Sequence, residues 1–99
     1  MNLPSQIKIG ATRFNVVIED DLRNFDDSRL DGHIKYGECK ICIDSKMDGD
    51  RPRDVLMHEI LHGIADHAAV NLDEGQVERL ANGIAAVLVD NPAFLEIWK

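Results

Sequence analysis

Two histidines four residues apart, with a glutamate directly after the first, form the most informative pattern in this 99-residue sequence: His58-Glu59-Ile60-Leu61-His62. On a helix, residues at this spacing lie about 40° apart on one face, so both imidazoles can bind one metal ion. Imidazole nitrogens are common zinc ligands, and a carboxylate beside the ion can take a proton from water. The pattern therefore predicts a hydrolytic zinc site held by His58 and His62, with Glu59 as general base.

The residues that flank this pattern favour a helix and an enzyme. Val55 lies three residues before the first histidine, Gly63 and Ile64 follow the second, and no proline interrupts the segment. In these features the segment is similar to the extended signature of zincin metallopeptidases. The plainer alternative, a core helix that carries two histidines by chance, is disfavoured by the same flanks.

A catalytic zinc ion usually has three protein ligands, so one more is needed. His67 is near in sequence but points roughly 140° away from His62 on the same helix. The third histidine of a metzincin would come six residues after His62, where the sequence has Ala68. Neither position supplies the ligand.

The second helical segment offers two glutamates. If the chain makes a helical hairpin about Val70-Asn71-Leu72, Glu78 comes level with His62, whereas Glu74 sits several ångströms higher and serves as a helix N-terminal charge. The spacing predicts Glu78 as the third ligand, although a solvated charge is its plainer explanation. Asn82, one turn further, could hydrogen-bond a ligand or the substrate.

Residues before the motif helix could complete the site. Tyr36 and His33 are the candidate donors to an oxyanion, although Tyr36 also fits a half-buried strand position. An edge strand near Ile34 to Glu38 could pair with an extended peptide substrate.

The rest of the chain must position these groups. Alternating apolar residues predict a hairpin within the first twenty residues and two further strands around Gly37. The polar segment from Asp20 to Gly32 is either a loop or one poor helical turn. Pro52 suits the first turn of the motif helix, which should run to about Ala69. A capping box at Asp73 and Gln76 starts the second helix, which should end at Asn91-Pro92. The second helix should carry a core stripe formed by Val77, Leu80, Ile84, Val87 and Leu88. The apolar tail at residues 94–98 should fold back onto the core, with an exposed docking segment as the alternative.

The composition limits the class of protein. Apolar residues make up 44% and charged residues 29%, which is typical of a folded domain, and residues 1–99 should form one domain. The net charge of −7 disfavours nucleic acid as a partner. No apolar run is long enough to span a membrane, the start has no signal-peptide pattern, and two cysteines are too few for a disulfide scaffold, so we expect a cytoplasmic protein.

A second motif supports a family resemblance. Glu78-Arg79-Leu80-Ala81-Asn82 resembles the E-x-x-A-N segment of the ImmA/IrrE metallopeptidases, and the chain also resembles the compact gluzincin-like domains called minigluzincins, which phages and bacteria encode. The resemblance implies an α+β, zincin-like fold with a small antiparallel sheet before a helix pair. It implies zinc as cofactor, Glu78 as the third ligand and limited proteolysis of a protein or peptide substrate. A dimer or an activating partner is conceivable for so small a chain.

Two rival hypotheses remain open at this stage. Cys39 and Cys42 followed by His58 and His62 meet a loose zinc-finger spacing, which would make the chain a binding module with a structural Cys2His2 site. Strand parity places the two cysteines on opposite faces, which disfavours that site. The other rival is an inactive zincin-like interaction domain.

Overall fold

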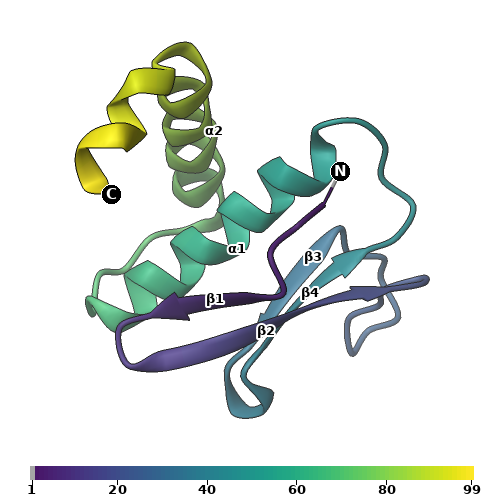
Figure 1. Cartoon of the computed structure of the whole chain (residues 1–99). Coiled ribbons are helices and arrows are strands. Elements are labelled where there is room, and N and C mark those ends of the chain that lie inside the picture. Colours follow the sequence, from purple (N-terminus) through teal and green to yellow (C-terminus); the bar gives the residue numbers. More distant parts are fainter. Residues whose placement is uncertain (1) are drawn as a thin grey trace.

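The computed structural model describes residues 2–99, in which a four-stranded sheet precedes two long helices (Figure 1). The strands are β1 (Gln6–Ile9), β2 (Thr12–Glu19), β3 (Gly32–Lys35) and β4 (Lys40–Asp44), the α-helices are α1 (Arg51–His67) and α2 (Glu74–Asp90), and the 3-10 helices are η1 (Tyr36–Glu38) and η2 (Pro92–Trp98). The predicted α+β class and the order of its elements are confirmed.

The sheet has the strand order β1-β2-β4-β3. β1 and β2 form the predicted antiparallel hairpin around Gly10, and β3 pairs with β4 in antiparallel register, Ile34 opposite Ile41. β2 and β4, however, are parallel, so the sheet is mixed and not wholly antiparallel as expected. The reason is the irregular segment between β2 and β3. It places β3 at the far edge of the sheet, and β4 then pairs with both β2 and β3 between them. β3 is therefore an edge strand.

The core lies between one face of this sheet and α1. Its buried residues come from β1, β2, β3, β4 and the first half of α1: Ile9, Phe14, Ile34, Ile41, Ile43, Val55 and Leu56. Gly63 lets α1 lie close to the strands, because a Cβ at that position would come within 2.6 Å of Ile9 Cδ1 and 3.1 Å of Ile34 Cδ1. The helix that carries the histidines is thus held firmly on the sheet.

The connection between the two helices differs from the expected hairpin. α1 ends at His67 in a Schellman motif, in which the amide of Val70 donates to the carbonyl of Ala65 (2.9 Å) and Ala69 adopts a left-handed conformation with φ of 56°. The chain then turns back and runs beside α1, so that α2 begins level with the middle of α1 and leads away from the sheet (Figure 1). The predicted capping box of Asp73 and Gln76 is present and starts α2.

The prediction that α2 packs a long apolar stripe into the core is wrong. Only Val77 and Ala81 of α2 are buried, and they contact Leu61 of α1 in a small second cluster. α2 points away from the sheet (Figure 1), so its later apolar residues are not buried in the core. The predicted stop at Asn91-Pro92 is confirmed, but η2 folds against α2 and not onto the core, with no buried residue.

Within residues 2–99, no single helix is long and apolar enough to cross a membrane. Only α2 and η2 taken together, which are bent by 95° at their junction, reach the required length and composition.

Candidate metal centre

The two motif histidines lie side by side on the exposed side of α1. Asp50 precedes this helix and Pro52 occupies its first turn, as predicted. His62 follows His58 by four positions, about one helical turn, and their ring centroids are 4.9 Å apart. Their side chains are 17% and 24% exposed, so both rings are reachable from solvent yet held by their neighbours.

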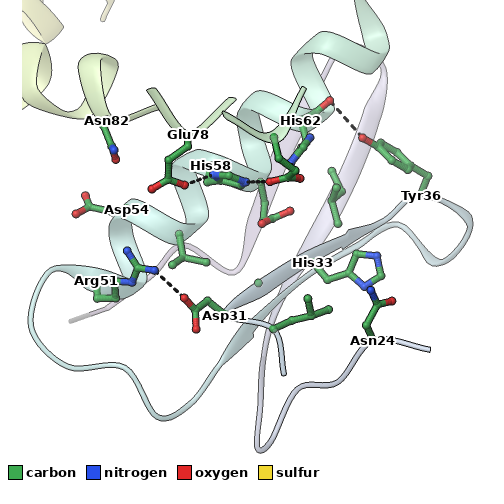
Figure 2. A pocket seen from close by; sticks show the side chains of 16 residues that line it. Asn24, Asp31, His33, Tyr36, Arg51, Asp54, His58, His62, Glu78 and Asn82 are labelled. Carbon is green, nitrogen blue, oxygen red and sulfur yellow. Dashed lines mark hydrogen bonds and ion pairs between the residues drawn. The ribbon is translucent and has the colours of Figure 1, made fainter. Parts of the chain in front are cut away.

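Two glutamates from the start of α2 face these rings, and Figure 2 labels one of them, Glu78. The carboxylate of Glu74 spans both: its Oε1 lies 2.7 Å from Nε2 of His62, and its Oε2 lies 3.1 Å from Nε2 of His58. Glu78 approaches the other nitrogen of His58, with its Oε2 3.1 Å from Nδ1. One histidine pair is thus contacted by two carboxylates.

The expectation that Glu74 sits too high to reach the histidines is wrong. That expectation placed the turn of a tight hairpin at Val70-Asn71-Leu72, with the two helices side by side directly from this turn. Because the connection runs back along α1, α2 begins beside the middle of α1 (Figure 1), and both Glu74 and Glu78 contact the histidines. The choice of Glu78 over Glu74 as metal ligand stays a prediction.

Glu59 lies on the inner side of the same helix turn. It is 7% exposed and packs against the edge strand, where a Cβ on Gly32 would come within 3.2 Å of its Cγ and Oε2. Burial raises the pKa of the Glu59 carboxyl, while His58 and His62 lower it and Glu74 raises it. A buried carboxyl with a raised pKa is a suitable proton acceptor near neutral pH.

These groups open into one cavity of about 480 Å³ between α1, β3 and the start of α2. Within residues 2–99, His58, His62 and Glu74 are the group whose possible ligand atoms all lie within 4.8 Å of one another. Two imidazole nitrogens and a carboxylate oxygen form the donor set of many catalytic zinc sites. The residues present therefore fit a zinc ion.

The remaining predicted site residues line the same cavity. The hydroxyl of Tyr36 donates a hydrogen bond to the carbonyl of His62 (3.2 Å), and burial, followed by the charges of Asp66 and Glu59, raises the pKa of this phenol. Asn82 lies one turn beyond Glu78 on α2 and is exposed. The imidazole of His67 packs against Gly10 and takes no part in the His58–His62 cluster, as predicted.

The comparison with protein families agrees with this geometry. A family model described as the IrrE N-terminal-like domain, Peptidase_M78, matches residues 11–99. The chain belongs to this family. The match extends from β2 through η2, so it includes the motif helix and the α2 segment that carries both glutamates.

Membership in the M78 family carries the zincin-like fold and a relation to metallopeptidases. The resemblance drawn from the two motifs is therefore confirmed at the level of the family and the fold. The comparisons with curated proteins and with solved structures gave no significant match.

The geometry of the M78 domain does not support a Cys2His2 site. Cys42 is fully buried on β4, where its thiol lies 3.4 Å from a carboxylate oxygen of Glu19 and burial raises its pKa to about 11. The thiol of Cys39 lies 3.6 Å from the carbonyl of Tyr36. The metal-capable cluster found within residues 2–99 contains neither thiol.

Sequence reasoning missed the contact of Glu74 with both histidines. The sequence did contain a signal: Glu74 directly follows the capping residue Asp73, so it must lie in the first turn of α2. What could not be seen was the path of residues 68–73, which decides where that first turn lies.

Proposed function

We propose that this M78 domain is a zinc-dependent peptidase that hydrolyses peptide bonds of a protein substrate. The observation that carries the proposal is that two imidazoles, the carboxylates of Glu74 and Glu78 and the buried Glu59 all border one open cavity. His58 and His62 supply two zinc ligands. Zinc in such a site lowers the pKa of water and polarises a carbonyl.

For the third ligand we propose Glu78. It belongs to the E-x-x-A-N segment, and it lies between the buried residues Val77 and Ala81, which fix this part of α2 against α1. Glu74 is the rival, supported by its contacts with both Nε2 atoms, but it is the first residue of α2 and its side chain is 75% exposed. The carboxylate that is not a ligand would orient a histidine ring.

Glu59 is the proton carrier of the proposed reaction. Its carboxylate accepts a proton from the attacking water, and the protonated carboxyl then donates that proton to the leaving amine. Burial against β3 limits the rotamers of this side chain, so the carboxylate is held beside the histidines for both transfers.

Two further residues would act on the substrate. Tyr36 can turn its hydroxyl from the carbonyl of His62 towards the oxyanion that forms at the scissile bond. Asn82 can donate a side-chain hydrogen bond to the substrate backbone. The edge strand β3 borders the cavity and offers backbone groups to an extended peptide.

The central test compares Glu59→Gln with Glu96→Gln, a matched change at an exposed residue of η2 outside the cavity. Hydrolysis of a dye-quenched unfolded casein and zinc content are measured for both zinc-loaded variants. We expect Glu59→Gln to lose about 10²–10⁴-fold in rate with its zinc retained, and Glu96→Gln to resemble the wild type. A fully active Glu59→Gln variant would exclude the proposed mechanism, and a wild type that binds zinc without hydrolysis would favour an inactive interaction domain.

A second test ranks the two carboxylates. Zinc affinity is measured by competition with a chromophoric chelator for Glu78→Gln and Glu74→Gln. If Glu78 is the ligand, its variant loses more than about 100-fold in affinity, and the Glu74 variant loses about 10–100-fold or less, as expected for a residue that only orients a ligand. The reverse order would assign the ligand to Glu74.

A further inference from the structure

The last third of the chain presents an apolar surface that nothing else in residues 2–99 covers. Leu80, Ile84 and Val87 recur at the four-three spacing of a buried helical stripe, yet they are exposed. Phe94 and Trp98 of η2 extend this surface and pack edge to face, with ring centroids 6.3 Å apart. We call these five residues the α2–η2 face.

The face is hollowed as well as apolar. A groove of about 450 Å³ runs along it, lined by Leu80, Ile84, Val87 and Phe94 together with Gly83. A Cβ built on Gly83 would meet nothing within 4 Å, so the backbone of α2 is open to close approach there. A groove with a glycine in its floor suits another helix.

The size of the face matches a protein contact. A fully exposed large apolar side chain presents on the order of 150–250 Å², and the five residues are 38% to 73% exposed, so the α2–η2 face presents roughly 400–600 Å². That is the upper end of the range found for ordinary surface patches of monomers. Two such faces, with their polar margins, would bury roughly 1,200 Å², the lower bound of a specific interface.

Two charged residues at the margin of the α2–η2 face indicate that its partner is a second copy of the chain. Arg79 and Asp90 are eleven residues apart, which places them about 20° apart on the same flank of α2. Neither takes part in an ion pair among the salt bridges of residues 2–99. When two copies of α2 pack antiparallel about Ile84 and Ala85, Arg79 of each copy comes opposite Asp90 of the other. The face is thus complementary to itself, as a two-fold interface requires.

We propose that the α2–η2 face is the contact surface of a symmetric homodimer, in which two copies of α2 pack antiparallel. The proposal is independent of the proposed catalysis, because the five residues of the face take no part in the His58–His62 cluster.

The test measures the mass of the full chain in solution by sedimentation equilibrium. The wild type is expected to be a dimer, and Ile84→Asp a folded monomer, because a charge at the centre of the face weakens association by at least about tenfold. Val89→Asp is the matched control: Val89 is 56% exposed on the opposite side of α2, and its variant should remain a dimer. Circular dichroism confirms that each variant is folded.

A charge exchange tests the two-fold arrangement itself. Arg79→Asp and Asp90→Arg should each weaken the dimer, and the double variant should restore it, because the exchanged charges meet again across the axis. A monomeric wild type overturns the proposal. If the fluorescence of Trp98 in that monomer also shifts when anionic lipid vesicles are added, the partner of the face is a membrane surface. A dimer that survives Ile84→Asp, or a double variant without rescue, equally overturns it.

Discussion

The two halves of this M78 domain hold their residues in place by different means. The sheet and α1 share a core of seven buried apolar residues, and α1 presents His58, Glu59 and His62 from that base. α2 is anchored by little more than Val77 and Ala81, yet it supplies both carboxylates of the site. The centre therefore joins a rigid half to a weakly held one, and a metal bound there would itself fasten α2 to α1.

The largest expected effect is a loss of stability in the rigid half. Ile41→Ala removes a side chain that is 0% exposed and should lower the free energy of unfolding by about 2–5 kcal/mol. Val89→Ala, on the exposed side of α2, should change it by less than about 0.5 kcal/mol. Urea denaturation measures both. Similar values for the two variants would mean that the halves do not differ in packing.

Zinc should stabilise the weakly held half most. At a free zinc concentration 100 times Kd, binding adds about 2.7 kcal/mol to the stability of every segment whose opening releases the ion. We expect hydrogen exchange to slow more in α2 than in β4, since β4 is already protected by the core. The exchange rates of the two segments are measured by mass spectrometry of zinc-loaded and chelator-treated protein. Protection that rises only in the sheet would contradict the comparison.

The anchor of α2 can be weakened by itself. Val77→Ala removes two methyl groups from a fully buried side chain and should cost about 1.5–2 kcal/mol. Because Val77 holds the first turns of α2 against Leu61, the same variant should also bind zinc less tightly. Ile41→Ala should keep the wild-type zinc affinity when it is assayed below its unfolding temperature. Equal zinc affinity of the Val77 variant and the wild type would show that α2 is positioned by other contacts.

The smallest expected effect is at the connection between the halves. Ala69 is left-handed with φ of 56°, a conformation that costs an alanine about 1–2 kcal/mol and a glycine almost nothing. After the greater chain entropy of glycine in the unfolded state is subtracted, Ala69→Gly should raise the free energy of unfolding by about 0.5–1 kcal/mol. Ala68→Gly, at the neighbouring residue with φ of −82°, should lower it. Thermal denaturation of the pair tests this, and two changes of the same sign would be the contrary result.

Local patterns accounted for much of the fold. Alternation of apolar residues located the strands, Pro52 and the capping box located the starts of both helices, and Asn91-Pro92 located the end of α2. Each of these signals acts between residues a few positions apart, so it is visible without knowledge of the fold. The parallel pairing of β2 with β4 was not visible, because it depends on the path of the irregular segment between β2 and β3.

The sequence by itself determined the chemistry of the centre: two imidazoles and a carboxyl on one helix turn, fixed by the helical repeat at His58, Glu59 and His62. Only the tertiary structure decided which other groups meet them. The return of residues 68–73 along α1 brings Glu74 as well as Glu78 to the histidines, and it carries the rest of α2 away from the sheet. The apolar stripe of α2 gives the physical reason. The helical period of its apolar residues predicts that this face is buried, but which surface buries it depends on the packing of distant segments or of a second chain.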